Sequence, residues 1–512
     1  MLGAEQDKTY NDSEVKTMVK RTIIIGGGIG GLTAAAFLSK EGTDVTVLEA
    51  SNEWGGCAGK FQRGKFLYPA GATLGMGFEQ GGVHDKLFRE LHLSFQEHSL
   101  LDVIMDIHLP EKTISYYRDR ALYLKEVEKH FPHLTAKIRA FYSDIWKTGA
   151  EVKKLIDPLP VLPPKTAFEW GKLLTSLKPS TLGLFPYFQS TMAALLKKHE
   201  LQDERDFVHL IDAQLIDSMQ TTSADCSAIL GAYALTVYHD GAFYVNGGLY
   251  QIAEHLAAFA KDRGAVLKKR SWVKSIHKEN GRYRVTDQKN KTYDADYIIC
   301  NLPLPGFISL LSADLIKQLS KAYRKKQPLQ QWGTMTLYLT VKEEVIPENF
   351  PLFHQVMDND SGDMTEGHHL FLSVSKKEDA RRAPAGYRTM TASTHTDLKL
   401  WDTKEKYDRY KEVLTNRMLR SIETAIPRLQ DGLTDVMPGA PGAWETFTKR
   451  PGGMVGGYPQ TLEHSLFNSL SHRTGIPGIY LCGDSVFPGA GTIGVSVSGY
   501  HASQSVLRDL RS

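Results

Sequence analysis

The stretch RTIIIGGGIGG, residues 21–31, decides the fold of this chain. Its first five residues are mostly apolar and β-branched, so they predict a short buried strand. The glycines after them fit the pattern G-x-G-x-x-G, and residues 32–40 predict a helix. A second strand is predicted at 44–48, and it ends at Glu49. This order of strand, glycine turn, helix and strand is typical of an α/β, Rossmann-like dinucleotide-binding unit.

Each glycine of the turn has a physical role in holding a pyrophosphate. Gly26 permits the tight turn, Gly28 lets the backbone approach the phosphates, and Gly31 lets the helix pack close to the strand. Gly30 completes the turn before the helix, whose free N–H groups favour an anion. Glu49 is placed to accept hydrogen bonds from a ribose. The alternative is a glycine turn without a ligand, but the complete strand, helix and acid context favours a nucleotide.

Composition excludes several other classes of protein. The chain has 512 residues, 42% hydrophobic and 23% charged, with a net charge of +3, which predicts a globular protein with two domains and no nucleic-acid partner. Four scattered cysteines with no C-x-x-C pair predict neither a metal site nor disulfides, and they fit a reducing cytosol. Residues 1–20 are expected to be a flexible leader, and no apolar run is long enough to span a membrane. We expect a cytoplasmic protein, with any membrane contact peripheral and on the inner face.

Two further segments favour FAD over NAD as the dinucleotide. The pair Gly55 and Gly56 follows the acid closely, and the stretch GCAGKF continues to Lys60. It resembles the second signature of glutathione-reductase-type FAD flavoproteins, and the resemblance implies that bare backbone there, together with Lys60, lies along the cofactor. The same resemblance implies that the backbone of Val273, in a predicted strand, meets the adenine. Plain sheet structure is the alternative for Val273.

The C-terminal segment resembles the last FAD motif of the same superfamily. A buried strand at 478–482 is followed by Gly483 and Asp484, then by Gly491 and a helix predicted at about 495–507. By resemblance, Asp484 holds a ribityl hydroxyl, although a helix cap is the other reading of such a residue. The remaining implied contacts are backbone N–H groups that face the flavin pyrimidine edge, where a helix N-terminus stabilises negative charge: Ile493, Gly494 and Val495.

Together these segments resemble the phytoene desaturase family, which includes carotenoid isomerases and retinol saturases. The match covers residues 21–80, 236–303 and 451–512. It implies a FAD-dependent oxidoreductase of the carotenoid desaturase or isomerase type, acting on a long apolar polyene. Cys57 stands where bacterial desaturases carry a basic residue, which makes this segment more similar to the isomerases and saturases. Cys482 lies within a predicted strand, so FAD is expected to be non-covalent. The alternatives are an amine-oxidase-like enzyme for a small polar amine, a retinol-saturase-like reductase, and a flavin-binding scaffold without turnover.

The remaining sequence predicts how the chain is divided. We expect an FAD-binding domain from residues 21–95, 236–303 and 451–512, and an inserted α+β, membrane-facing substrate domain from 96–235 and 304–450. Within 165–200, aromatic and leucine residues alternate with lysines. This pattern fits either a lipid-docking helix pair or ordinary helix packing with lysines on the wet face. His239 and Asp240 are expected to be structural, because neighbours in a strand point apart. The sequence identifies no catalytic residue and leaves the oligomeric state open.

Overall fold

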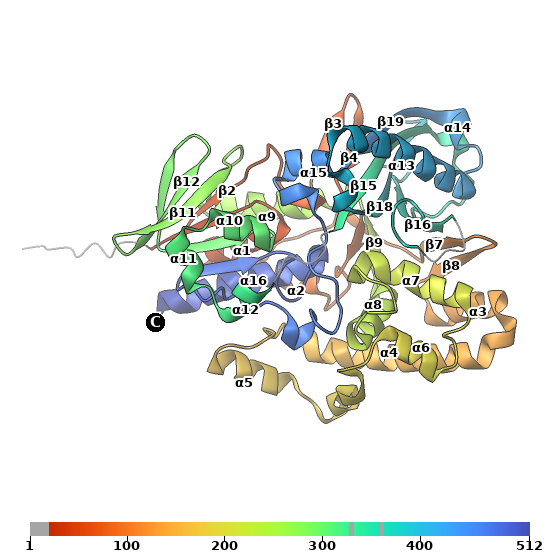
Figure 1. Ribbon diagram of the computed structural model, residues 1–512, viewed down its shortest axis with the longest axis horizontal. Coiled ribbons are helices and arrows are strands. Elements are labelled where there is room, and N and C mark those ends of the chain that lie inside the picture. Colours follow the sequence, from red (N-terminus) through yellow and green to blue (C-terminus); the bar gives the residue numbers. More distant parts are fainter. Residues whose placement is uncertain (1–19, 327–331, 359–362, 512) are drawn as a thin grey trace, which may run out of the picture.

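The computed structural model describes residues 20–326, 332–358 and 363–511. Apart from Lys20, the predicted leader lies outside these residues. Figure 1 shows a parallel sheet with its helices on the left and a larger sheet on the right, with a group of helices below that larger sheet. The predicted α/β, Rossmann-like fold with an α+β part is confirmed.

The parallel sheet unites regions that are far apart in the sequence. It has five strands in the order β10–β2–β1–β14–β20, all neighbours parallel. Their bounds are β1 Arg21–Ile25, β2 Asp44–Leu48, β10 Val266–Lys268, β14 Tyr297–Asn301 and β20 Ile479–Cys482. β1 is central because its apolar residues are buried on both faces, as crossover-connected parallel sheets require.

Different elements cover the two faces of this sheet. Ile24 and Val47 face a core formed with three helices, whereas Ile23 and Leu48 face a core formed with a small antiparallel sheet and three short helices. The first group is α1 Ile29–Lys40, α9 Tyr250–Asp262 and α16 Gly491–Arg511. The second is β11 Val273–Glu279, β12 Arg282–Asp287, β13 Thr292–Ala295, α10 Leu304–Leu310, α11 Ala313–Gln318 and α12 Lys321–Lys325.

A seven-stranded sheet forms the second half of the molecule. Its order is β19–β15–β18–β17–β16–β7–β8, and only β16 and β7 pair in parallel. The bounds are β7 Val103–Leu109, β8 Lys112–Tyr117, β15 Trp332–Lys342, β16 Phe353–Met357, β17 His369–Val374, β18 Tyr387–Asp397 and β19 Leu433–Gly439. α13, Lys404–Ala425, and α14, Leu429–Gly432, pack on one part of it.

Helices from the first half of the chain pack against β7 and β8 and extend toward the parallel sheet. They are α3 Arg120–His130, α4 Thr135–Ile156, α6 Met192–Lys198, α7 Arg205–Met219 and α8 Ala228–Asp240. α5, Ala167–Ser176, and the 3-10 segment η3, Pro179–Tyr187, pack in a separate cluster with α4 and α8. His239 and Asp240 end α8, so their predicted strand environment is wrong. Among the described residues, no helix combines the length and the apolar composition needed to cross a membrane.

Short elements connect the two halves. They are β3 Lys60–Arg63, β4 Phe66–Pro69, β5 Leu74–Met76, α2 Val83–Glu90, β6 His98–Leu100, β9 Ala242–Val245 and α15 Pro441–Thr448. β3 pairs with β4, and β9 lies between β5 and β6. Phe61 of β3 stacks on Tyr68 of β4, with ring centroids 5.3 Å apart, and meets Tyr338 of β15 edge-on. The two halves therefore share a packed aromatic contact.

Candidate functional site

The candidate site lies where the central strands of the parallel sheet end. Gly26 follows β1, Glu49 follows β2, Asn301 ends β14, and Gly483 follows β20. Because these strands are parallel, their carboxyl ends meet at one edge of the sheet, which is where ligands bind in open α/β folds. Segments separated by more than four hundred residues in sequence are thus brought together by strand pairing.

The first glycine turn is packed so tightly that side chains are excluded from it. Gly26 has φ +100°, and a Cβ there would lie 2.6 Å from the Asn301 carbonyl oxygen. A Cβ on Gly31 would lie 2.1 Å from the Gly26 carbonyl oxygen. Gly28 caps α1 without any side-chain hydrogen bond, so the N–H groups of the first turn are not capped by the chain's own N-cap residue. This bare helix N-terminus has the features of an anion site.

Glu49 is held rigidly at the end of β2. Its side chain is buried, Oε2 accepts a hydrogen bond from the Gly27 N–H at 2.6 Å, and Oε1 accepts one from the Ser51 N–H at 2.7 Å. The Ser271 N–H donates to the Glu49 carbonyl at 2.7 Å, which brings the start of β11, and with it the buried Val273, to this strand end. Glu49 and Val273 therefore lie in the same part of the molecule.

The second glycine pair lies directly against the first turn. The Gly55 N–H donates to the Gly27 carbonyl at 2.9 Å, and Gly28 and Gly55 form a parallel bridge. Gly56 has φ +57° and lies beside Gly28. Lys60 is directed elsewhere: its Nζ lies 3.2 Å from Glu254 Oε1 and 4.0 Å from the centre of a tyrosine ring on α9.

The C-terminal motif completes the same edge. Gly483 has φ +104°, and its N–H donates to Ser498 Oγ at 2.8 Å. α16 begins at Gly491, about one turn before the predicted start. A Cβ on Gly30 would lie 2.8 Å from the Val495 carbonyl oxygen, so α1 and α16 touch through bare backbone near their amino ends. Ile493 contacts Gly77, and Gly494 packs against the Gly489 backbone.

Asp484 has a cationic partner that the sequence did not reveal. Its Oδ2 lies 2.5 Å from Nη2 of Arg450, and the two side chains are only 12% and 13% exposed. Arg450 Nε also donates to the Met454 carbonyl at 2.6 Å. Burial opposes the charged form of Arg450, but the Asp484 carboxylate outweighs it and raises the pKa of the guanidinium. The guanidinium of Arg450 therefore remains charged inside the protein.

Asn301 is a second residue that sequence reasoning missed. Its amide lies between the glycine segments: a Cβ on Gly28 would be 2.7 Å from Asn301 Nδ2, and one on Gly483 would be 3.0 Å from Asn301 Oδ1. The Cys482 thiol also donates to Asn301 Oδ1, at 3.7 Å. Asn301 ends the buried strand β14, just as Gly26 follows β1. This position at the carboxyl end of an apolar run is the signal that could have identified it.

The residues at this edge fit a flavin dinucleotide. The two glycine turns offer bare backbone for phosphates, and the Glu49 carboxylate is held in place for a ribose. The amino ends of α1 and α16 lie side by side next to them. A family model for flavin containing amine oxidoreductases matches residues 29–507. The chain belongs to this family. It is a FAD-dependent oxidoreductase, as predicted.

Several characterised proteins are similar over nearly the whole chain. Prolycopene isomerase 1, chloroplastic, from an Oncidium hybrid cultivar is 27% identical over 503 residues, covering 95% of this chain and 84% of that protein. The 4,4'-diaponeurosporene oxygenase of Staphylococcus aureus (strain USA300) is 22% identical over 525 residues, covering 96% and 98%.

Several solved structures share the fold. An oxidoreductase from Methanosarcina mazei superposes with a TM-score of 0.63 at 16% identity, over 95% of this chain and all of that one. Putrescine oxidase bound to putrescine gives a TM-score of 0.61 at 12% identity, over 96% and 99%. At these identities the likeness shows the fold alone.

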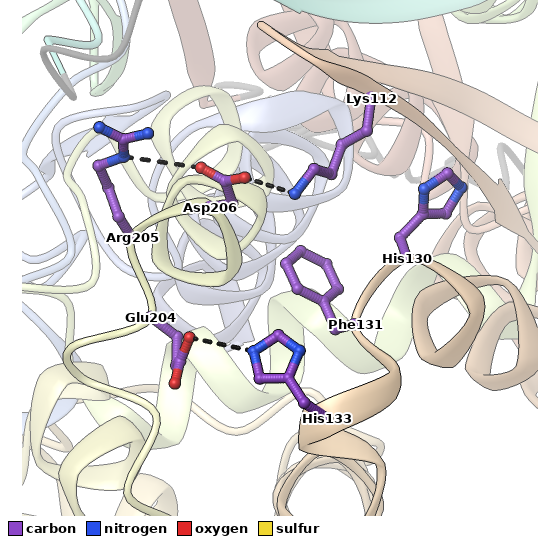
Figure 2. A pocket seen from close by; sticks show the side chains of 7 residues that line it. All are labelled: Lys112, His130, Phe131, His133, Glu204, Arg205 and Asp206. Atoms are coloured by element: carbon purple, nitrogen blue, oxygen red, sulfur yellow. Dashed lines mark hydrogen bonds and ion pairs between the residues drawn. The ribbon is translucent and has the colours of Figure 1, made fainter.

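A hollow elsewhere on the molecule is lined mainly by charged side chains, and its volume is about 390 Å³. Figure 2 shows it between the end of α3 and the start of α7. Lys112 Nζ lies 2.5 Å from Asp206 Oδ2, and Arg205 Nε lies 3.6 Å from Asp206 Oδ1. Because these two cationic side chains are balanced by Asp206 and Glu204, the hollow presents no surplus charge that would favour an anion or a cation.

Proposed function

We propose that this FAD-dependent oxidoreductase acts on a long apolar polyene of the carotenoid type, which it takes from a lipid surface. Two characterised relatives with carotenoid names support the substrate class. The observation that carries the proposal is an exposed apolar surface on α5 and η3 that continues inward to the C-terminal FAD motif.

This surface, which we call the α5–η3 patch, concentrates large apolar side chains in one short segment. Leu182 is 76% exposed and Phe185 is 80% exposed, although burial of such residues is the rule. The other large, exposed apolar side chains of the segment are Phe168, Trp170, Leu174 and Leu177. Apolar side chains gathered on one exposed face mark a partner or a membrane.

Charge favours a membrane as the partner of the patch. The exposed Lys165 and Lys178 flank it, and its one acidic residue, Glu169, is buried and paired with Arg473 at 2.8 Å. The patch therefore presents apolar and cationic groups without exposed acids, as interfacial segments bound to anionic lipid do. Figure 1 shows α5 projecting from the edge of the molecule, where such contact is unobstructed.

An apolar cluster extends inward from the patch. Leu173 on α5 and Leu184 on η3 belong to one buried cluster that also contains Leu466 and Phe487. Phe487 lies three residues after Asp484, within the C-terminal motif. A pocket of about 140 Å³ beside the cluster is lined only by apolar side chains, including Trp170 and Phe467. An apolar ligand that enters this pocket stays in apolar surroundings, as it does in lipid.

The binding roles follow from the contacts at the sheet edge. The backbone of Gly28 and Gly55 takes the pyrophosphate, Glu49 takes the adenosine ribose, and Asp484, positioned by Arg450, takes a ribityl hydroxyl. The cofactor is non-covalent, since Cys482 lies buried in β20. Bound FAD supplies a two-electron acceptor or donor, and the amino end of α16 stabilises negative charge beside it. The domain division expected from the sequence stays a prediction.

The test uses purified protein with its flavin absorbance recorded. Anaerobic incubation with carotenoid precursors in anionic liposomes should change the polyene spectrum, with flavin bleaching if the polyene is oxidised. A change of polyene isomer without net flavin bleaching indicates isomerisation instead. Putrescine serves as the polar comparison substrate, because an enzyme of the same fold binds it. Flavin bleaching by putrescine with no change in any polyene would refute the proposal and leave the FAD site intact.

A further inference from the structure

A cluster of metal-ligand side chains lies at the seam of the large sheet, away from the parallel-sheet edge that forms the FAD site. β7 and β16 come from segments some 250 residues apart, and only three residue pairs join them in parallel. All other neighbouring strands of this sheet pair antiparallel. This short seam is therefore the place where the two parts of the large sheet are joined along their edges.

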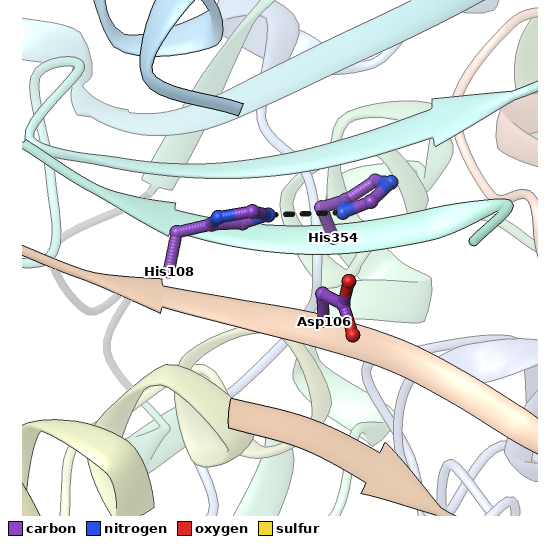
Figure 3. A group of neighbouring side chains, drawn as sticks. All are labelled: Asp106, His108 and His354. Atoms are coloured by element: carbon purple, nitrogen blue, oxygen red, sulfur yellow. Dashed lines mark hydrogen bonds between the residues drawn. The ribbon is translucent and has the colours of Figure 1, made fainter. Parts of the chain in front are cut away.

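Three side chains meet across the seam. Asp106 and His108 lie two residues apart on β7 and so on one face of the sheet, and His354 stands opposite Asp106 in the register. One ligand atom from each lies within 4.8 Å of the others. Figure 3 shows the three side chains gathered across the two strands. His108 Nε2 and His354 Nδ1 are 3.1 Å apart.

The outward-facing nitrogens of both imidazoles are held by oxygen atoms. His354 Nε2 donates to the Pro351 carbonyl at 2.9 Å, which can only accept, so Nδ1 carries a bare lone pair. His108 Nδ1 lies 3.1 Å from Thr113 Oγ1, which is able to accept. Without a metal ion His108 Nε2 donates to the His354 lone pair, and a shift of the His108 proton to Nδ1, toward Thr113, would turn a second lone pair inward for a metal ion. Metal-ligating histidines are oriented by such outer hydrogen bonds.

The local environment leaves ligand atoms of the three groups available. His354 is fully buried, and His108 is partly buried beside it. Asp106 accepts a hydrogen bond from Ser115 Oγ at 2.7 Å through one oxygen, which leaves the other for a ligand.

We propose that Asp106, His108 and His354 bind one divalent transition-metal ion, with Zn²⁺ as the best match, which fastens β7 to β16. Two imidazoles and a carboxylate form a common zinc ligand set, with a fourth position for water. Zinc–nitrogen bonds of about 2.0–2.1 Å at a tetrahedral angle separate the two nitrogens by about 3.3 Å. The observed 3.1 Å requires only a small opening. The seam also explains why no metal spacing is visible in the sequence, since the ligands come from remote strands.

Zinc binding to the flavin-loaded protein tests the site. After treatment with a chelator and buffer exchange, the wild type should take up one equivalent of Zn²⁺ by calorimetry, and Co²⁺ should give a visible ligand-field spectrum. His108→Gln should weaken Zn²⁺ binding by at least about 10- to 100-fold. This variant retains a donor for His354 Nδ1 and is therefore expected to fold. Zn²⁺ should raise the melting temperature of the wild type only, because the ion binds the folded state.

His277→Gln is the matched control, since His277 is an exposed strand histidine on β11. It should bind Zn²⁺ as the wild type does. Asp106→Asn provides a second variant of almost unchanged volume, and it should lose the Co²⁺ spectrum as well. If the wild type takes up no Zn²⁺, or if His108→Gln and Asp106→Asn bind it as tightly as the wild type, the cluster is a hydrogen-bonded histidine pair and the proposal is wrong.

Discussion

The FAD edge of the parallel sheet and the α5–η3 patch differ in how they would bind a ligand. The FAD edge offers bare backbone to a charged dinucleotide, whereas the patch offers exposed apolar side chains to lipid. The glycine turns of the FAD edge lack side chains, and their backbone is packed so tightly that a Cβ on Gly31 would lie 2.1 Å from the Gly26 carbonyl oxygen. On the patch large side chains are present and exposed, and a Cβ on Gly171 would meet nothing within 4 Å. The comparison teaches that the FAD edge depends on the absence of side chains from its glycines, and the patch on the exposure of its large side chains. Substitutions should therefore change stability and flavin content at the FAD edge, and membrane binding at the patch.

The largest effect is expected where the FAD edge loses a buried charge. Asp484→Ala leaves Arg450 buried without its partner and should lower the free energy of unfolding by about 3–5 kcal/mol. FAD occupancy, measured from the ratio of flavin to protein absorbance, should fall with it. Asp402→Ala is the control, because its ion pair with Lys406 is exposed and contributes at most about 1 kcal/mol. A variant as yellow and as stable as the parent would show that the C-terminal motif is misplaced.

The next largest effect is expected from acid, which should lower stability near the FAD edge and leave membrane binding by the patch unchanged. His84 is fully buried, with Nδ1 2.8 Å from the Met76 carbonyl and Nε2 3.3 Å from Ser496 Oγ on α16. Burial lowers the pKa of His84 from 6.5 to about 4. As pH falls, His84 is protonated in the unfolded chain before it is protonated in the folded protein. The free energy of unfolding should therefore fall by roughly 3 kcal/mol between pH 6.5 and pH 4.

Urea unfolding at pH 7.5 and pH 4.5 measures this loss. His84→Asn, which retains a donor for the Met76 carbonyl, should flatten the pH dependence by up to one proton. Other buried histidines act in the same direction, among them His239 and His501. Residues 165–188 contain no histidine, so vesicle binding by the patch should not change between pH 7.5 and 5.5. An unaltered pH dependence in His84→Asn would exclude His84 as a contributor.

A matched pair of helix glycines compares the regions directly. Gly499→Ala on α16 would place Cβ 2.0 Å from the Gly30 carbonyl oxygen and should cost about 1–3 kcal/mol, because α1 and α16 must separate. Gly171→Ala on α5 meets open space and should stabilise by about 0.5–1 kcal/mol. Both are read from urea midpoints and flavin content. Equal effects at the two positions would contradict the packing described for the FAD edge.

The smallest expected effect on stability belongs to the patch itself. Leu182→Ser should leave the free energy of unfolding within about 0.5 kcal/mol, because the side chain is 76% exposed. Affinity for anionic vesicles in a flotation assay should fall about tenfold, since one leucine loses its apolar contact. Leu122→Ser changes a leucine that is 51% exposed on α3, outside the patch, and should leave vesicle binding unchanged. Loss of binding in both variants would point to a general effect of surface hydrophobicity.

Local sequence was sufficient wherever a structure is held by contacts between near neighbours. The strand, glycine turn and helix at 21–40 were predictable because β-branched runs favour strands, and because the turn needs a positive φ that glycine adopts readily and other residues avoid. The start of α16 was predicted late because Gly491 begins a helix here only through packing of its first turns on α1 and on Gly489. Val273 is buried beside the strand that ends at Glu49, whereas the Lys60 ammonium lies against Glu254 on α9. Their roles toward FAD stay predictions.

By itself the sequence determined the Rossmann-like unit, the FAD class of cofactor and the glycines that admit it, because these depend on backbone conformations that few residues allow. Tertiary structure alone decided that Arg450 pairs with Asp484, that Asn301 stands between the two glycine segments, and that His354 meets His108. It also decided which leucines of the α5–η3 patch face outward. The physical reason is that a partner hundreds of residues away is chosen by strand pairing and helix packing, which no local pattern records.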